Sequence, residues 1–145
     1  MSVTKRIETL IEELTDLNRL IRNKLATSSI DSGDFEVFAK NVFYHEKSLN
    51  QMMINEETIS ILKELKLGFS TNAVDKHVLA LEAKCDLHKA AVVDLENLRS
   101  RLRKSEQYTD DNKRIINNKL IAENYSIQLY SQAMLDLSTI IDFLD

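Results

Sequence analysis

Residues 112–144 of the chain read NKRIINNKLIAENYSIQLYSQAMLDLSTIIDFL, and Lys and Arg are absent after Lys119. Two apolar stripes run through this segment at the helical spacings of three, four and seven. The first stripe comprises Ile115, Ala122, Tyr125, Leu129, Ala133, Leu137, Ile140 and Leu144. The second stripe comprises Ile116, Leu120, Ile127, Tyr130, Met134 and Ile141. A helix that packs on one side only needs a single apolar stripe. The segment is therefore either a central helix with neighbours on both sides, or a helix whose second apolar face is left uncovered by the chain and is available to a partner.

The composition of the whole chain predicts an all-α protein. Its 145 residues include no Pro and only two Gly, far below the average usage of these residues. Because Pro and Gly are frequent in the turns and loops of β-rich and loop-rich folds, their scarcity indicates long uninterrupted helices. A chain of this length typically forms one domain. We therefore expect a single helical domain over residues 1–145, as an antiparallel bundle or helical hairpin of three to five long helices with coiled-coil-like packing.

Apolar periodicity and capping residues place these helices along the chain. The expected helices span about residues 2–27, 34–66, 72–105 and 110–144. Ser, Asp and Gly at residues 28–34 offer the backbone competing hydrogen bonds and predict a loop. Asp31, Ser32 or Asp34 is expected to cap the helix that follows. Gly68 suits the left-handed position at a helix end.

Two helix boundaries remain open at this level. The apolar face of residues 34–66 shifts near Asn55. This helix therefore either bends there or gives way to a second short helix that Asn55 caps. Residues 105–112 are polar. They form either a break between two helices or a polar segment in the middle of one very long helix.

Charge and hydropathy exclude several classes of partner. The net charge of −4 and the acidic pI argue against a nucleic-acid binder, because such proteins carry a basic face. No apolar run is long enough to cross a bilayer, so we expect no membrane insertion. Residues 1–6 lead into alternating charge rather than the apolar core of a secretory signal. A single Cys allows no internal disulfide and fits a reducing compartment. These features predict a cytoplasmic protein.

The residues that could carry chemistry do not form a catalytic or metal-binding pattern. His77, Cys85 and His88 belong to one expected helix. Zinc needs about four ligands that converge in a tetrahedron, and three side chains along one straight helix cannot surround an ion unaided. The chain has no Gly-rich phosphate loop and no Ser/His/Asp arrangement with turn context. We therefore expect neither an enzyme nor a bound cofactor or metal.

Three further features occur together in the chain. An amphipathic helix ends in a small-residue loop with Gly-Asp at residues 32–34, followed by Phe35 and Phe38. A Lys followed by Leu comes about three turns later, in Glu46–Leu49, and the final helix opens with Asn and continues through Ile and Leu at residues 112–120. In these features, which span nearly its whole length, the chain resembles the FlgN family of flagellar type III export chaperones.

The resemblance implies a cytoplasmic chaperone that is a monomer or dimer. Such a chaperone binds the amphipathic terminal helix of secreted hook–filament junction proteins, keeps these proteins soluble and delivers them to a component of the export gate. A client helix would lie against the second stripe, as in other helix-in-groove complexes. The competing prediction is a structural coiled-coil or helical-bundle subunit of a larger assembly, in which the second stripe is a permanent interface. The predicted partner-binding residues are Ile116, Leu120, Ile127, Tyr130, Met134 and Ile141.

Overall fold

The computed structural model describes residues 2–144, and four long α-helices account for most of them. The elements are α1 (Val3–Thr27), α2 (Phe35–Leu67), α3 (Thr71–Lys104), α4 (Asp110–Ile140) and the short 3-10 helix η1 (Ile141–Phe143). No residue from 2 to 144 belongs to a β-strand. The all-α class expected from the composition is confirmed, and the helix ends lie within one residue of the predicted ones except at the end of α4.

Each long helix begins after a short side chain whose oxygen accepts a hydrogen bond from an amide of the first turn. The four capping residues are Ser2, Asp34, Ser70 and Thr109. Asp34, one of the three predicted caps of α2, accepts from the amide of Glu36 at 2.9 Å. Gly68 does not take the predicted left-handed conformation. Its φ is −156°, and its amide donates to the carbonyl of Glu64 at 3.2 Å, so the end of α2 is closed without it.

The structure resolves both open boundaries. α2 continues through Asn55, which caps no second helix; this residue lies inside α2 and is buried. Residues 105–109 separate α3 from α4, so the alternative of one very long helix is wrong. Glu106 in this connection has φ 60°, a left-handed conformation that helps to reverse the chain direction.

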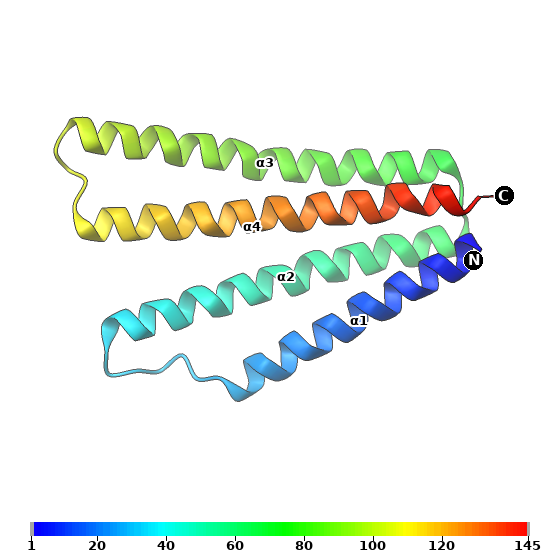
Figure 1. Ribbon diagram of the computed structural model, residues 1–145, viewed down its shortest axis with the longest axis horizontal. Coiled ribbons are helices and arrows are strands. Elements are labelled where there is room, and N and C mark those ends of the chain that lie inside the picture. Colours follow the sequence, from blue (N-terminus) through cyan, green and yellow to red (C-terminus); the bar gives the residue numbers. More distant parts are fainter. Residues whose placement is uncertain (1, 145) are drawn as a thin grey trace.

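The four helices form two antiparallel hairpins, α1 with α2 and α3 with α4 (Figure 1). The two hairpins contact each other mainly through α2 and α4, which run in the same direction. They converge at the end that holds the α2–α3 connection, the start of α1 and η1 (Figure 1). They diverge toward the end that holds the other two interhelical connections. We call these the closed end and the open end.

The hydrophobic core lies at the closed end. All buried residues of the first three helices fall within residues 7–18, 54–65 and 74–85, and none occurs within residues 35–53 of α2. The core consists of Ile7, Leu10, Ile54, Ile61, Leu62, Leu65, Val74, Leu81, Cys85, Tyr130, Ala133, Leu137 and Ile140. The first half of α2, toward the open end, therefore contributes no buried residue to the core.

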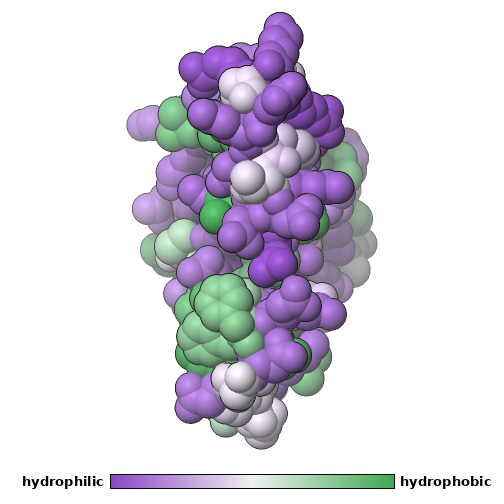
Figure 2. All heavy atoms as spheres, turned by 90° about the vertical axis from the view of Figure 1, so that its left-hand side faces the viewer, coloured by the Kyte–Doolittle hydropathy of each residue, from purple (hydrophilic) through white to green (hydrophobic). Residues whose placement is uncertain are grey.

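Figure 2 looks directly onto the open end. Hydrophilic residues cover most of this surface, and one apolar patch lies in its lower half, where Figure 1 places the α1–α2 connection and the start of α2. Exposed apolar side chains of this part of the chain are Ile30, Phe35 and Val37, and Phe35 is 72% exposed. The open end thus keeps apolar surface in contact with water.

Candidate functional site

The second stripe of α4, which we predicted to bind a partner, is largely covered by the chain's own helices. Ile116, Leu120 and Tyr130 are buried, and Ile127, Met134 and Ile141 are half-buried against the core. The first stripe also reaches the core, through Ala133, Leu137 and Ile140. Of the two sequence-based alternatives, the central helix with neighbours on both sides describes α4. Partner binding by the second stripe would require the hairpins to separate, and it stays a prediction.

A groove lies instead between the N-terminal halves of α2 and α4, toward the open end. It consists of two adjoining cavities of about 400 and 240 Å³, both lined by Phe43, Glu46 and Ala122. The main apolar residues of the groove are Val42, Phe43, Leu49, Met53, Ile115, Ala122 and Tyr125. From Ala39 to Met53 the α2 side of the groove is about 21 Å long, the length of about four helical turns.

The groove exists because α2 changes its apolar face near Asn55. Up to that point the apolar positions of α2 follow one face, and from Ile54 onward they turn toward the core. Leu49 and Met53 consequently lie outside the core and are 56% and 57% exposed. The shift in register that we read as a bend or a break therefore marks a change of neighbours along a continuous helix.

One wall of the groove is fixed by contacts between α2 and α4. The Lys47 ammonium lies 4.1 Å from the centroid of the Tyr125 ring, a cation–π contact. The Tyr125 hydroxyl donates a hydrogen bond to Oε1 of Gln51 at 2.9 Å. Burial raises the pKa of Tyr125 above its ordinary value of 10.0, so this hydroxyl remains a neutral donor at neutral pH. These contacts hold an aromatic ring beside the apolar residues of the groove.

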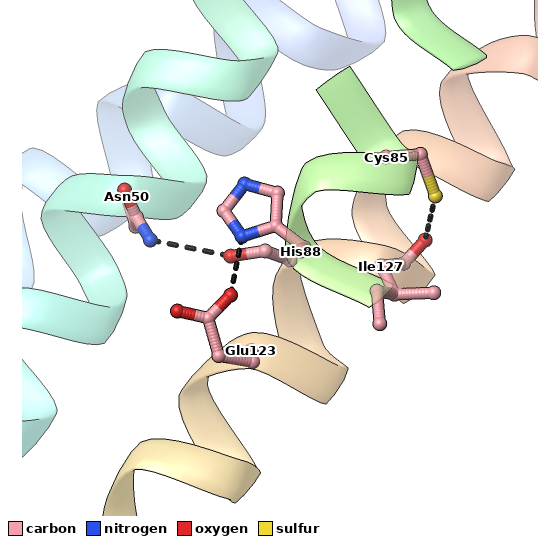
Figure 3. A network of polar contacts seen from close by, with 6 residues as sticks. Asn50, Cys85, His88, Glu123 and Ile127 are labelled. Carbon is pink, nitrogen blue, oxygen red and sulfur yellow. Dashed lines mark hydrogen bonds and ion pairs between the residues drawn. The ribbon is translucent and has the colours of Figure 1, made fainter. Parts of the chain in front are cut away.

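A network of polar contacts joins α2, α3 and α4 at the inner end of the groove (Figure 3). Nδ1 of His88 lies 2.5 Å from Oε2 of Glu123 and links α3 to α4. Nδ2 of Asn50 donates to Oγ of Ser126 at 3.2 Å and links α2 to α4. Ser126 is buried, and both partners of the His88–Glu123 pair are largely withdrawn from solvent. The network marks the level at which the core gives way to the groove.

The three residues considered as metal ligands have separate partners. Nε2 of His77 lies 3.1 Å from a carboxylate oxygen of Glu64. Cys85 is buried, and its Sγ lies 3.9 Å from the carbonyl oxygen of Ile127. His88 belongs to the polar network. Within residues 2–144, no three side chains of His, Cys, Asp or Glu gather where they could hold a metal ion.

A separate cavity of about 420 Å³ lies between the end of α1 and α2. It contains Ser28 and His45, whose Oγ and Nε2 atoms are 3.0 Å apart. The Ser28 hydroxyl lies 3.3 Å from the Leu25 carbonyl, a position that suits donation to that carbonyl, with His45 then donating to Oγ. None of the residues that line this cavity is acidic. The pair therefore lacks both the orienting carboxylate and the proton direction of a nucleophilic triad.

Two further observations bear on the class of protein. Over residues 2–144, no helix is at once long enough and apolar enough to cross a membrane. Comparison with protein-family models, with curated proteins and with solved structures found no match for the chain. The likeness to the FlgN family rests on the sequence patterns alone and stays a prediction.

Proposed function

We propose that the chain is a helix-binding protein without catalytic activity, and that the groove between α2 and α4 holds one amphipathic helix of a protein partner. The observation that carries this proposal is the exposure of Leu49 and Met53 inside a groove as long as a helix of about four turns. Such a groove suits the recognition mode in which a helix lays its apolar face between two others.

The apolar residues of the groove are sufficient for useful affinity. Phe43, Leu49, Met53 and Tyr125 all line the same cavity, and full burial of such a side chain contributes about 1.5–3 kcal/mol. Ordering the partner and restricting its motion offsets much of this gain. A remainder of about 4–8 kcal/mol corresponds to a Kd between about a millimolar and a micromolar. Met53 adds a flexible thioether that adapts to partners of different shape.

The specific function that we propose within this class is that of a FlgN-like export chaperone. Its client would be the amphipathic terminal helix of hook–filament junction proteins, which it would keep soluble for a component of the export gate. The sequence patterns that resemble the family support this role. In contrast to the sequence-based prediction, the client would occupy the groove at the open end, because the second stripe of α4 is largely covered.

A binding measurement with paired variants tests the groove. The probe is a fluorescein-labelled amphipathic peptide of about 18 residues, with a Leu stripe at helical spacing flanked by Gln. Leu49→Asp with Met53→Asp places two charges in the groove, and we expect the peptide's affinity to fall at least about tenfold. The melting temperature should stay close to that of the native chain, because both residues are outside the core.

The matched control is Leu79→Asp with Leu87→Asp. These residues are exposed on α3 and do not line the groove. This variant should bind the peptide as the native chain does, and a peptide of the same composition without the stripe should not bind. Equal binding by the groove variant and the control variant would overturn the proposed site.

The chaperone role needs a second measurement, with the terminal helices of hook–filament junction proteins as probes. The native chain should bind them and suppress their aggregation in a light-scattering assay, and the groove variant should do neither. Light scattering coupled to size-exclusion chromatography separates this role from the structural alternative. A chaperone should be a monomer or dimer, whereas a larger oligomer of fixed size would favour an assembly subunit.

A further inference from the structure

The outer face of α3 presents apolar side chains to solvent. α3 forms one edge of the molecule (Figure 1), and its buried residues, Val74, Leu81 and Cys85, turn toward the core. On the opposite side of the helix, Leu79 and Leu87 are 65% and 72% exposed. Three exposed alanines lie on the same side. We call this set the α3 strip; it consists of Leu79, Ala80, Ala83, Leu87 and Ala90.

A cation stands at one end of the α3 strip and an anion at the other. Lys76 and Asp94 are 18 residues apart. This separation is five full helical turns, so both side chains leave the helix on the side of the strip, about 27 Å apart along its axis. Both residues are exposed, and neither forms an ion pair within residues 2–144. The strip thus lies between two unpaired charges of opposite sign.

This face is self-complementary about the level of Cys85. Consider two α3 helices that pack antiparallel, with a two-fold axis at that level. Each residue of one copy then lies at the height of the residue that is equally far from Cys85 on the other side. Lys76 of each copy comes directly opposite Asp94 of the other, whereas a parallel pair would bring like charges together. The residues that share a height are Ala83 with Leu87, Ala80 with Ala90, and Lys76 with Asp94.

We infer that the α3 strip is the contact through which two copies of this chain form an antiparallel dimer. In the dimer Leu87 of each copy packs over the alanines of the other, and two Lys76–Asp94 ion pairs close the ends of the apolar contact. Asp86 lies beside the two-fold axis. Lys89 of its own chain is 3.9 Å away and offsets its repulsion from the same residue of the other copy. The inference goes beyond the proposed function, because the groove lies on α2 and α4 and stays open in the dimer.

Sedimentation equilibrium over a range of protein concentrations tests the dimer. A contact of one helix from each copy is small, so we expect a Kd of about 10–100 μM for the native chain. Lys76→Asp places two carboxylates opposite each other at both ends of the contact, and Asp94→Lys places two ammonium groups there. Each variant should therefore raise the Kd at least about tenfold. An equimolar mixture of the two variants restores both ion pairs in the mixed dimer and should associate as the native chain does.

Two further variants control for net charge and for the apolar part of the contact. Lys63→Asp, at an exposed position of α2, changes the net charge as Lys76→Asp does and should dimerise like the native chain. Leu79→Asp with Leu87→Asp should abolish the dimer. At the protein concentration of about 5 μM used for circular dichroism the native chain is mostly monomeric, so this variant should keep the native melting temperature.

Three results would overturn the inference. The first is a native chain that stays monomeric at about 500 μM, well above the expected Kd. The second is a dimer that both single charge reversals leave intact, which would place the contact elsewhere. The third is a mixture of Lys76→Asp and Asp94→Lys that fails to regain the dimer, which would exclude the antiparallel pairing. Peptide binding in the groove is measured separately, so none of these results bears on the proposed function.

Discussion

Asn55 donates a hydrogen bond from Nδ2 to Oδ1 of Asn18 at 2.9 Å, and both side chains are buried between α1 and α2. Nδ2 of Asn18 in turn donates to the carbonyl oxygen of Met52 at 3.1 Å. A buried pair of this kind is satisfied in one register of the hairpin, since sliding either helix by a turn would separate the two amides. The pair therefore fixes how α1 lies against α2.

The first prediction concerns this pair. Asn18→Leu leaves Nδ2 of Asn55 without its acceptor, and Asn55→Leu leaves Oδ1 of Asn18 without its donor. Each single change should lower the free energy of unfolding by about 1–3 kcal/mol. The double variant places two apolar side chains together and should lose less than the sum of the single changes. Urea denaturation of the four proteins measures the coupling, and strictly additive losses would show that the two residues do not stabilise each other.

The second prediction concerns the second stripe of α4. Tyr130 is buried in the core, and Met134 packs against it. Tyr130→Asp with Met134→Asp buries charges without partners, so we expect a loss of several kcal/mol and an unfolded domain. Circular dichroism melts check this, with Leu79→Asp and Leu87→Asp on exposed α3 positions as the control. A native-like melt combined with loss of helix binding would instead restore the second stripe as the docking surface.

The helices were predictable because their signals are local. Asp34, Ser70 and Thr109 each accept a hydrogen bond from their own first turn, so a capping residue followed by a periodic segment suffices to place a boundary. The predicted C-terminal end of α4 was less accurate. Its apolar residues continue past Ile140, but the chain tightens there into η1, and a tightened last turn leaves no clear mark in the pattern.

The groove could not be derived in the same way. Two stripes on α4 show that more than one face is apolar, but not which faces the other helices cover. That depends on where the hairpins converge, which is set by contacts between residues far apart in the chain, such as Asn50 with Ser126. The one local signal was the shift of the apolar face near Asn55. A change of neighbour and a helix break produce the same pattern, so the shift was open to the wrong interpretation.

The third prediction concerns alkaline pH. Burial raises the pKa of Tyr130 above 10.0, and the nearby charge of Cys85 adds to the effect. Above about pH 10 the tyrosine of the unfolded chain loses its proton before the buried one does. The folded state then binds more protons, so its stability falls as the pH rises through this range.

Tyr130→Phe removes this source of alkaline instability. The stability difference between the native chain and the variant should be constant between about pH 7 and pH 9 and should shift in favour of the variant above about pH 10. Guanidinium unfolding at each pH measures it. Tyr44→Phe, at an exposed site, should follow the native curve, and a parallel loss of stability in the native chain and Tyr130→Phe would disprove the assignment.

The fourth prediction concerns the unequal stability of the two ends. Residues 39–50 and 58–65 belong to the same helix, but only the second segment contributes to the core. Local opening requires less free energy where few apolar contacts are broken, so amides of residues 39–50 should exchange with deuterium faster than those of residues 58–65. A peptide bound in the groove adds contacts to the first segment alone. It should therefore slow exchange in residues 39–50 and leave the slowly exchanging core segment unchanged. Equal protection of both segments in the free chain would show that the open end is held as firmly as the core, and the groove would then have little freedom to adapt to a partner.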